Sequence, residues 1–533
     1  MKKIINIIIT LILGAIIYYF TLPAINLNNI GFYIFVSFLI MIYAFLDLIN
    51  HEKKIELFKK GKRLPTIEYP KTFIICTSIV GILMLGTVVV NFICSPLFNA
   101  KSYQQRIIVD ETGNFTEDFE EVNFNQLPLL DRASSEVLGD RVMGQMSDLV
   151  SQYSVSEQYT QINYNDSIMR VTPLQYADPI KWLTNRNKGI VGYITVNSVT
   201  GESNLVKLNK GMKYSSSALF NEKLERKLRF KYPTTNFGKI SFEIDNEGNP
   251  YYIVTTLDYT AIGLKAKVTG VIIFDPITGE SKKYSNKDIP TWVDIAYSAD
   301  LVIEQIDNWG TYKNGFWNSI FGQKNVVNTT DGYNYLAMND DIYLYTGITS
   351  VVSDESNLGF VLTNMRTGKT TYYSVPGAEE YSAMSSAEGQ VQDMGYTSTF
   401  PLLINLKGKP TYLVSLKDSN GLVKMYGFID VKDYQKVTVT DASKGIIVAK
   451  DNYLKSNKEE VKEENLIRKD IKIDSISSAI INGYTYYYIE SDDSKYKVSI
   501  SLSDELPFIK NGDTLTIGFY ETTDKVIEIE KIY

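Results

Sequence analysis

The amino-acid sequence predicts an α+β protein in which three N-terminal transmembrane helices are followed by tandem helix-plus-antiparallel-sheet modules and a small C-terminal β-barrel. Three observations lead to this fold class. Three long apolar runs lie within residues 1–98, and each approaches the roughly 20 residues that cross a hydrocarbon core. A strand-and-turn phrase recurs in the polar part of the chain, which is typical of stacked repeats. Short β-rich runs separated by turn residues fill residues 473–533.

These patterns divide the chain into segments, since 533 residues exceed what one hydrophobic core usually serves. The predicted segments are a three-span transmembrane region (1–98), a connector (99–130), four modules (131–211, 212–288, 289–376 and 377–440), a charged linker (441–472) and a β-barrel (473–533). The chain has 38 Tyr against 15 Pro, as expected of an ordered polypeptide that favours β-structure.

The composition excludes several classes of function. A net charge of −7 argues against a nucleic-acid partner, because neutralising phosphates requires a clustered basic surface. The two cysteines, Cys76 and Cys94, lie inside an apolar run, and the single histidine, His51, follows another. The large polar part therefore has neither a Ser-His-Asp triad nor a histidine- or cysteine-ligated metal site. We expect no catalytic residue, no metal and no cofactor.

Residues 4–46 contain no charged side chain, and a break at residues 22–29 divides them into two spans. Residues 72–97 form a third uncharged run, in which Gly81 and Gly86 are expected to allow close packing against a neighbouring helix. A cleaved signal peptide is an alternative for the first run. Its apolar stretch is longer than a usual signal sequence, however, and a second span follows at once.

Basic residues set the expected orientation. Lys2 and Lys3 precede the first span, and the loop between the first two spans is uncharged. Seven basic residues lie between the second and third spans: Lys53, Lys54, Lys59, Lys60, Lys62, Arg63 and Lys71. The positive-inside rule therefore predicts a multi-pass cell-membrane protein with a cytoplasmic N-terminus and with the chain after about residue 98 outside the cytoplasm. A site for lipid headgroups or a partner is the alternative role of the basic loop.

The repeated phrase is clearest at residues 271–280, VIIFDPITGE, where an apolar strand ends in a turn. The Asp side chain can bond back to the backbone, Pro presets φ, and Gly tolerates a positive φ. The phrase returns as ITVNSVTGE at residues 194–202 and as VLTNMRTGK at residues 361–369. A second phrase, GNPYYIV at 248–254, returns 160 residues later as GKPTYLV at 408–414, which indicates two modules of about 80 residues each.

Each module is expected to open with an amphipathic helix and to continue with several strands. The predicted helices cover residues 131–153, 215–231, 291–309 and 378–394. In the second of them, the apolar stripe that should face the core consists of Leu219, Phe220, Leu224 and Leu228.

This order of features resembles a known family. A helix, then Gly-x-Pro-x-Tyr-x-Val, then an apolar strand ending in Asp-x-x-Thr-Gly is similar to the PepSY domain of protease propeptides and of envelope-associated regulatory proteins in bacteria, and the resemblance covers residues 131–439. Asn197 and Asn364 stand where the family favours Asp, and the fourth module has Asp433-Tyr434-Gln435 without Thr-Gly. The resemblance implies an α+β sandwich with helices on one sheet face, and a binding, inhibitory or regulatory role outside the cell membrane.

A charged run centred on residues 458–464 indicates a linker or a solvated helix. Five or six short strands follow within residues 473–533, two of them joined by the turn at residues 510–513, and they predict a closed barrel of OB or SH3-like type. Acidic residues outnumber lysines in this segment, which argues against a nucleic-acid role for it.

Two acidic stretches invite comparison with calcium loops, because carboxylates before a glycine turn are hard-cation ligands. For Asp245-Asn246-Glu247-Gly248 a simple turn is the better interpretation, since its repeat partner Asn405-Leu406-Lys407-Gly408 keeps the turn and lacks the acids. Asn339-Asp340-Asp341 is interpreted as a solvated turn in the same way. No pattern selects a pair of carboxylates of the kind that glycoside hydrolysis needs.

The stretch most typical of a ligand contact is residues 309–323, where Trp309, Phe316, Trp317 and Phe321 are interleaved with glycines. Amphipathic aromatic side chains on a glycine-rich loop can form a hot spot for a partner or a glycan. A loop in which the same side chains fold inward is the favoured interpretation. These four residues are the candidate partner contacts.

The sequence thus predicts a non-catalytic, membrane-anchored extracytoplasmic protein of a bacterial-type cell envelope, with a binding or regulatory role. Its expected partners are the lipid bilayer and an envelope protein or wall component. An enzyme that cleaves cell-wall polymer through acidic residues is the competing class, and a structural subunit of a membrane complex is a third. A deep cleft with two facing carboxylates would favour the enzyme, and continuous sheets with exposed edges the binding protein.

Overall fold

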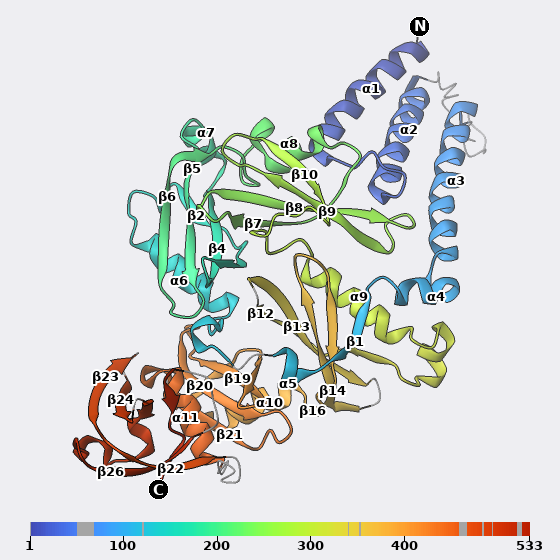
Figure 1. Cartoon of the computed structure of the whole chain (residues 1–533). Helices are drawn as coiled ribbons and strands as arrows, with labels where there is room; N and C mark the ends of the chain where they lie inside the picture. Colours follow the sequence, from blue (N-terminus) through green and yellow to red (C-terminus); the bar gives the residue numbers. More distant parts are fainter. Residues whose placement is uncertain are drawn as a thin grey trace. The chain divides into compact units, whose positions relative to one another are not determined.

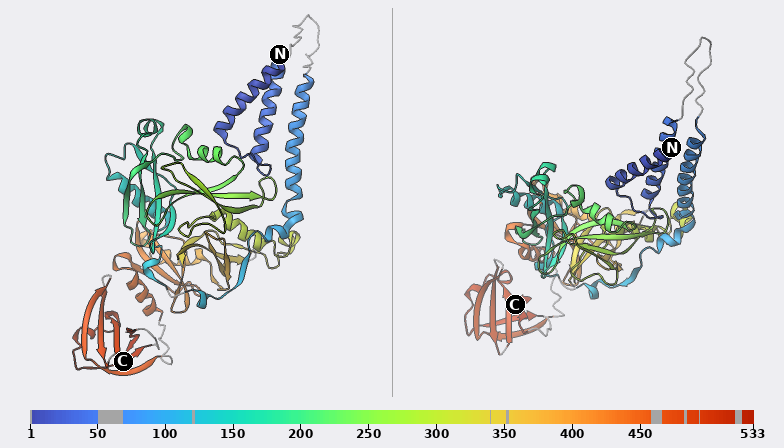
Figure 2. Two further views of the ribbon diagram at one scale, coloured as in Figure 1. Left: turned by 45° about the horizontal axis from the view of Figure 1, so that its top comes forward. Right: turned by 90° about the horizontal axis from the view of Figure 1, so that it is seen from above.

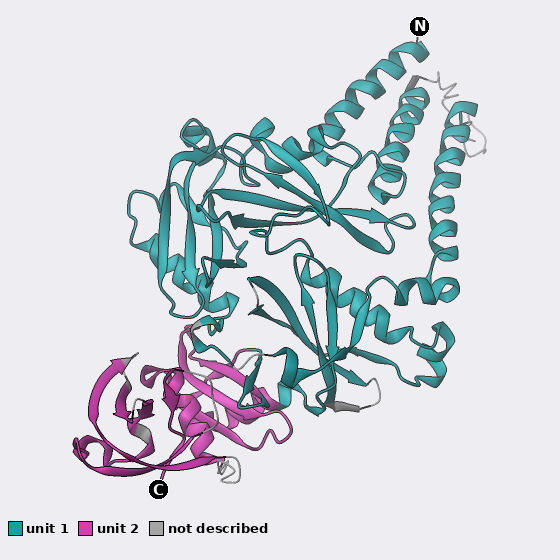
Figure 3. Cartoon of the chain, viewed as in Figure 1, with its two compact units in different colours: residues 1–382, 400–410 teal, residues 383–399, 411–533 magenta. Residues whose placement is uncertain are grey.

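The computed structural model describes residues 2–50, 69–119, 122–338, 340–350, 353–457, 466–481, 484–492, 494–519 and 525–533. The basic residues 53–63 and the whole charged run at residues 458–464 lie outside this set. The chain divides into two compact units (Figure 3): Met1–Ser382 with Phe400–Pro410, and Ala383–Thr399 with Thr411–Tyr533. The unit boundary passes through the predicted fourth module.

Three N-terminal helices are long and apolar enough to span a membrane: α1 (Lys2–Thr21), α2 (Ile30–Asn50) and α3 (Lys71–Ile93). Figure 2 shows them leaving one side of unit 1. Many of their apolar side chains are exposed, as lipid-facing residues are. Gly81 and Gly86 meet no neighbour, contrary to expectation; the close approach is at Gly14, where an added Cβ would lie 2.7 Å from Leu39 of α2. These helices support localisation in a membrane.

The first module contains α6 (Arg132–Gly144), α7 (Pro179–Asn185) and an antiparallel sheet. The strands are β2 (Tyr153–Val155), β3 (Thr160–Tyr164), β4 (Ser167–Tyr176), β5 (Ile190–Asn197) and β6 (Ser203–Met212), in the order β2-β4-β5-β6, and β3 also pairs with β4.

The second module has the 3₁₀ turn η2 (Phe220–Glu222), α8 (Leu224–Lys231) and the strands β7 (Asn236–Ile244), β8 (Pro250–Tyr259), β9 (Ala266–Phe274) and β10 (Ser281–Ser285). Its sheet order is β10-β9-β8-β7 (Figure 1).

The third module contains α9 (Ala299–Thr311) and the strands β11 (Val327–Thr329), β12 (Asn334–Met338), β13 (Asp341–Ser350), β14 (Ser353–Asn364), β15 (Thr370–Tyr373) and β16 (Gly377–Ala378). The predicted connector is ordered and contributes to this module. It forms α4 (Pro96–Gln104), β1 (Val109–Gly113) and α5 (Phe115–Asp118), and β1 pairs in parallel with β15. The helices of the modules are shorter than the sequence predicted.

The first three modules follow one plan, in which strands leave and return as an antiparallel meander. In the first and third modules two short strands, β2 with β3 and β11 with β12, pair with the same long neighbour. In the second module a single strand, β7, takes their place and carries a bulge between Phe237 and Ile240. The modules therefore differ in whether the first strand is interrupted.

The repeated phrase forms the same turn three times. The side-chain oxygens of Asn197, Asp275 and Asn364 each accept hydrogen bonds from the backbone N–H groups two and three residues later. The glycine of each phrase has a positive φ, between 74° and 78°. In unit 2 the equivalent residue is Asp430, which accepts from Lys432 and Asp433.

Modules one and two share one hydrophobic core, formed by one face of each sheet together with α8. Val171 and Ile194 of the first sheet and Phe242 and Val254 of the second are completely buried within it. The third module has its own core beneath α9, and Val302 and Ile306 of that helix are its buried centre. The helices cover apolar sheet faces, as an α+β fold requires.

Unit 2 contains the sheet β17-β19-β20-β21 and a C-terminal domain. The sheet consists of β17 (Thr397–Ser398), β19 (Lys409–Lys417), β20 (Val423–Asp430) and β21 (Val437–Asp441). Nearby helices are α10 (Glu380–Gly389), which crosses the unit boundary, and α11 (Ile446–Ser456), and the short strand β18 (Leu402–Leu406) belongs to unit 1.

The C-terminal domain has two sheets around one core and, within the described residues, no closed barrel. One sheet is β22-β26-β28 (Ile467–Lys472, Thr514–Phe519, Lys531–Ile532); the other is β23-β24-β25-β27 (Ser475–Ile481, Tyr484–Ser491, Ser494–Ser499, Ile527–Glu528). Between β25 and β26 the chain forms two 3₁₀ turns, Ile500–Leu502 and Leu506–Phe508, in place of a strand that would bridge the sheets. The predicted closed barrel is therefore wrong, and the described residues form a domain of two sheets.

Candidate functional site

The four predicted contact residues separate into a buried and an exposed group. Trp309 lies in the core under α9, 5% exposed, with the Lys313 ammonium 3.8 Å above its ring centroid. Trp317 and Phe321 are 62% and 78% exposed, and their rings stack at 5.9 Å. Phe316 is half-buried and touches Trp317 edge-on. The loop thus displays two of the four aromatic side chains.

The second module is attached directly to the spans by two buried arginines of α8. Arg229 donates to the carbonyl oxygen of Leu22, at the end of α1, at 3.0 Å, and also to the backbone of Thr235 at 2.7 Å. Arg226 donates to the carbonyl of Tyr19 at 2.9 Å, and its guanidinium lies 3.9 Å over the Tyr19 ring. Both arginines are buried to more than nine-tenths, so their charges are held against backbone carbonyls.

Asparagines complete the attachment at all three spans. In the loop between α1 and α2, Asn28 donates to the carbonyl of Tyr259 and Asn29 donates to Asn236, at 2.9 and 2.8 Å. At the end of α3, Asn91 exchanges two hydrogen bonds with the backbone of Ile262. The end of α1, the start of α2 and the end of α3 therefore all contact the same module. We call this set of contacts the span seam.

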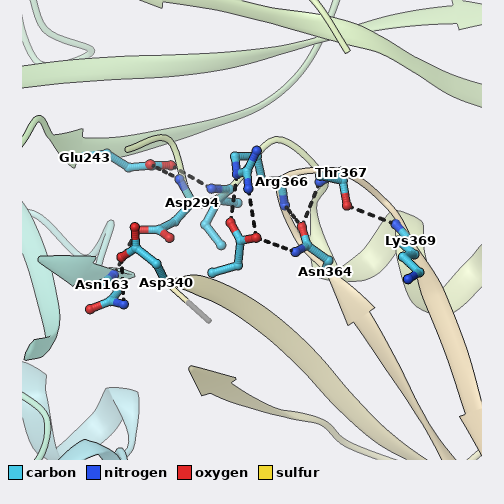
Figure 4. Close-up of polar contacts among 10 residues, drawn as sticks. Asn163, Glu243, Asp294, Asp340, Asn364, Arg366, Thr367 and Lys369 are labelled. Carbon is cyan, nitrogen blue, oxygen red and sulfur yellow. Dashed lines mark hydrogen bonds and ion pairs between the residues drawn. The ribbon is translucent and has the colours of Figure 1, made fainter. Parts of the chain in front are cut away.

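A cluster of buried carboxylates lies where the first three modules meet (Figure 4). Glu243, at the end of β7, is fully buried and accepts hydrogen bonds from Ser241 and from the backbone N–H groups of Asp294 and Ile295. The Asp294 carboxylate, 2% exposed, in turn accepts from the backbone N–H of Asn163 at 2.9 Å. Residues of module three are thus bonded here to both module two and module one.

The third module contributes a charge of opposite sign. Arg366, in the repeated turn after β14, donates two hydrogen bonds to the Asp341 carboxylate, at 2.7 and 2.8 Å. Asn364 donates a third, at 2.8 Å. Asp341 is 8% exposed, so the solvated turn expected at residues 339–341 is wrong at this residue. A bidentate pair of this kind fixes the relative position of two strands.

Burial governs protonation in the cluster. It raises the pKa of Glu243 to about 7, although the N–H and hydroxyl donors oppose this. Burial and the nearby Glu243 carboxylate raise the pKa of Asp294 well above its usual value. Arg366 has a raised pKa because it is bonded to Asp341. Two carboxyls with raised pKa values thus lie near the Asp341–Arg366 ion pair.

A pocket of about 470 Å³ opens beside this cluster. It is lined by parts of all three modules: Arg132, Ser156, Glu157, Gln158, Tyr159, Thr160, Gln161, Gln175, Lys239, Ile240, Ser241, Ile295, Ser298, Ala299 and Tyr335. Ser241 and Ile295 belong to its wall and also donate to Glu243. The pocket is therefore one hydrogen bond from the buried carboxylates. We call it the junction pocket.

A buried polar layer lies behind one wall of the junction pocket. Arg170, fully buried, donates to the side-chain oxygen of Gln161 at 2.7 Å, which leaves the Gln161 amide nitrogen without an acceptor among the described residues. Burial lowers the pKa of Arg170 to about 10. Tyr335, which lines the pocket and interacts electrostatically with Arg170, has a pKa raised by burial. The walls thus consist mainly of hydrogen-bonding groups and aromatic rings.

A second, smaller pocket of about 150 Å³ lies between the connector, β12 and β18. Asn405 donates to the carbonyl of Phe119 at its edge, at 2.7 Å. Each of the two pockets has a single carboxylate in its lining, Asp118 here and Glu157 in the junction pocket. A glycosidase needs two carboxyl groups facing the scissile bond, and neither lining supplies such a pair.

Sequence reasoning missed the carboxylate cluster and both arginines of the span seam. A usable signal was present at Glu243, which interrupts the apolar run between Phe242 and Ile244. Such a residue is buried only when it is paired or protonated. For Asp245 the turn interpretation fits the structure, since its carboxylate accepts from the backbone of Glu247 and Asn249. Within the described residues no group of His, Cys, Asp and Glu side chains is arranged to hold a metal.

Comparisons with known proteins add little. No protein-family model matches the chain, and no curated protein matches it. Among solved structures, the crystal structure of an alpha-L-arabinofuranosidase from Lactobacillus brevis is similar over 70% of this chain and 95% of that chain, at 7% identity and a TM-score of 0.16. A TM-score this low carries no argument about fold or function. The PepSY resemblance therefore stays a prediction.

Proposed function

We propose that this chain is a non-catalytic, membrane-anchored binding or regulatory protein of a cell envelope, with its modules outside the cytoplasm. The N-terminus and the basic loop before α3 would be cytoplasmic. The span seam supports a topology with three crossings, because the end of α1, the start of α2 and the end of α3 bond to one module. The regulatory role that the PepSY resemblance implies is part of this proposal.

The observation that carries the proposal is the span seam. A membrane-tethered enzyme needs only a flexible linker, whereas a regulator that relays a binding event to its spans needs a rigid attachment. Four buried or half-buried side chains of the seam, Asn28, Asn91, Arg226 and Arg229, bond the module to the spans. The junction pocket, formed by the same module and its two neighbours, is the proposed ligand site. An envelope protein or a wall component is the proposed occupant.

Photo-crosslinking in cells tests the binding role. A photoreactive phenylalanine analogue at Gln158, in the junction pocket, is expected to give a discrete adduct with a protein or with wall polymer. The same analogue at Lys210, an exposed position on the edge strand β6, serves as the control. Equal labelling patterns at both positions would contradict a ligand site in the pocket.

The enzyme alternative has its own test. If the protein cleaves wall polymer, the purified full chain should release soluble fragments from it, and Glu157→Gln or Asp118→Asn should abolish the release. We expect no release from the unmodified protein. Release that depends on either residue would favour the hydrolase.

Orientation is tested with one introduced cysteine. Ser216 is exposed, and in a variant without Cys76 and Cys94 the change Ser216→Cys provides a single thiol. A membrane-impermeant maleimide should label it in intact cells that have no outer-membrane barrier. Labelling that appears only after lysis would place the modules in the cytoplasm.

A further inference from the structure

Part of unit 1 displays apolar side chains close to the spans. Phe220 in η2 and Phe230 in α8 are 58% and 55% exposed, and Ile180 and Leu183 in α7 are 68% and 61% exposed. The sequence placed Phe220 on the stripe that faces the core, together with Leu224 and Leu228. Only the two leucines are buried there. Exposed aromatic and aliphatic side chains in neighbouring elements mark an interaction surface.

The same elements are strongly basic. Residues 179–186 and 220–231 together carry seven basic and two acidic side chains, in a chain whose net charge is −7. One of the two acids, Glu222, is buried and paired with Arg186 at 2.9 Å. Among the described residues, Lys181, Lys223 and Lys227 have no ion-pair partner. Their charges are therefore available to an anionic partner.

This basic and apolar face is continuous with the first span. The Phe230 ring packs against Tyr18 and Tyr19 of α1, with centroids 6.0 and 6.2 Å apart. Tyr19 donates to the side chain of Asn221 at 3.0 Å. Phe220 in turn packs against Trp182 of α7, at 5.8 Å. Figure 1 shows α8 beside the end of α1, with α7 beyond it.

We propose that η2, α8 and α7 form a second membrane-contacting face, which lies on the leaflet where α1 ends and binds anionic lipid headgroups. Tyr18 and Tyr19 occupy the end of a span, where aromatic residues mark the membrane interface. Phe220, Leu183 and Ile180 enter the same interface, and the lysines contact phosphate groups. The seam holds α8 at this level, because Arg226 and Arg229 bond to the last carbonyls of α1. The face is independent of the junction pocket.

Depth-dependent quenching tests this proposal with the full chain in liposomes. In a variant without Cys76 and Cys94, Phe220→Cys carries an environment-sensitive fluorophore, and the liposomes contain phosphatidylglycerol and phosphatidylcholine with brominated acyl chains. We expect strong quenching at position 220. The matched control is Val150→Cys, because Val150 is 50% exposed in the loop after α6, away from the spans. Leu183→Cys is the second probe, should the first variant fail to fold.

Charge reversal separates headgroup binding from simple proximity. Lys223→Glu combined with Lys227→Glu should reduce the quenching at position 220 to a level near that of the Val150→Cys control. Quenching at 220 and 183 no stronger than at 150 would overturn the membrane face. Disulfide dimers of the unlabelled Phe220→Cys variant, without lipid quenching of the labelled one, would make this face an interface between copies of the chain. If quenching at position 220 changes neither with charge reversal nor with removal of phosphatidylglycerol from the liposomes, the assignment of an anionic-headgroup site is overturned.

Discussion

At the scale of single residues, the junction of the three modules stabilises its buried acids in two ways: two have raised pKa values and a third is paired with an arginine. Glu243 and Asp294 favour the protonated form because burial raises their pKa values. Asp341 is instead paired with Arg366 through two hydrogen bonds. Removing the partner of a buried charge costs more than removing the pair. We therefore expect loss of the ion pair to lower the free energy of unfolding, and the buried carboxyls to make that free energy depend on pH.

Arg366→Ala is expected to destabilise unit 1 by about 3 kcal/mol, because it leaves the Asp341 carboxylate buried without a counter-charge. Thermal unfolding of the detergent-solubilised protein measures this. Lys369→Ala is the control, since Lys369 is exposed in the same turn and should change stability by less than about 0.5 kcal/mol. Equal effects of the two changes would show that the pair does not stabilise the junction.

The raised pKa of Glu243 predicts how stability depends on pH. The unfolded chain loses this proton near the ordinary value of 4.5, whereas the folded protein keeps it to about pH 7. The stabilisation is thus complete below the unfolded pKa and is lost as the pH rises through the folded one. Asp294 acts in the same direction. We expect the free energy of unfolding to fall over this window, as measured by denaturant titration at several pH values.

Glu243→Gln should reduce the decrease in unfolding free energy with rising pH, and the remaining decrease should be the part due to Asp294. Glu247→Gln, at an exposed turn position nearby, should leave it unchanged. A slope of stability against pH that is the same in all three proteins would contradict a protonated Glu243.

At the scale of elements, local chemistry made the turns predictable. Asp275 caps its own turn through the N–H groups of Ile277 and Thr278, which are close in sequence. Asp275→Ala should therefore cost about 1 to 2 kcal/mol in unfolding free energy. Asp275→Asn should cost less than about 0.5 kcal/mol, because Asn keeps the accepting oxygen and is the native residue in modules one and three. A loss as large for Asn as for Ala, in the same unfolding assay, would contradict an equivalent turn.

The sequence predicted the order of helix and strands because apolar periodicity and turn residues act over a few positions. It failed where distant segments decide the outcome. Phe220 follows the helical stripe but lies in η2, before α8 begins, and is exposed. Asp341 looks solvated but meets Arg366, 25 residues later. Barrel closure failed for a similar reason, since strand pairing between β25 and β26 depends on how the intervening chain folds. The candidate aromatic loop was found by composition, whereas the junction pocket needed three modules to be brought together.

At the scale of the whole molecule, the span seam bonds the second module to all three spans, and we propose that this attachment is rigid. Spin labels at Ile12→Cys in α1 and Lys282→Cys in β10, both exposed positions, should give a narrow distance distribution in a background without Cys76 and Cys94. Arg226→Ala with Arg229→Ala should broaden it, because both arginines bond to the end of α1. Glu225→Gln is the matched control on the same helix. A broad distance distribution between the two labels in the protein with both seam arginines intact would contradict a rigid attachment.

We propose that the repeated modules work outside the cytoplasm while fixed to the spans. Protease treatment of intact protoplasts tests this most directly, with antibodies against unit 1 as the readout. We expect the protease to digest the modules in intact protoplasts and to leave a fragment that contains the spans. Modules that resist the protease until the protoplasts are lysed would show that they lie in the cytoplasm.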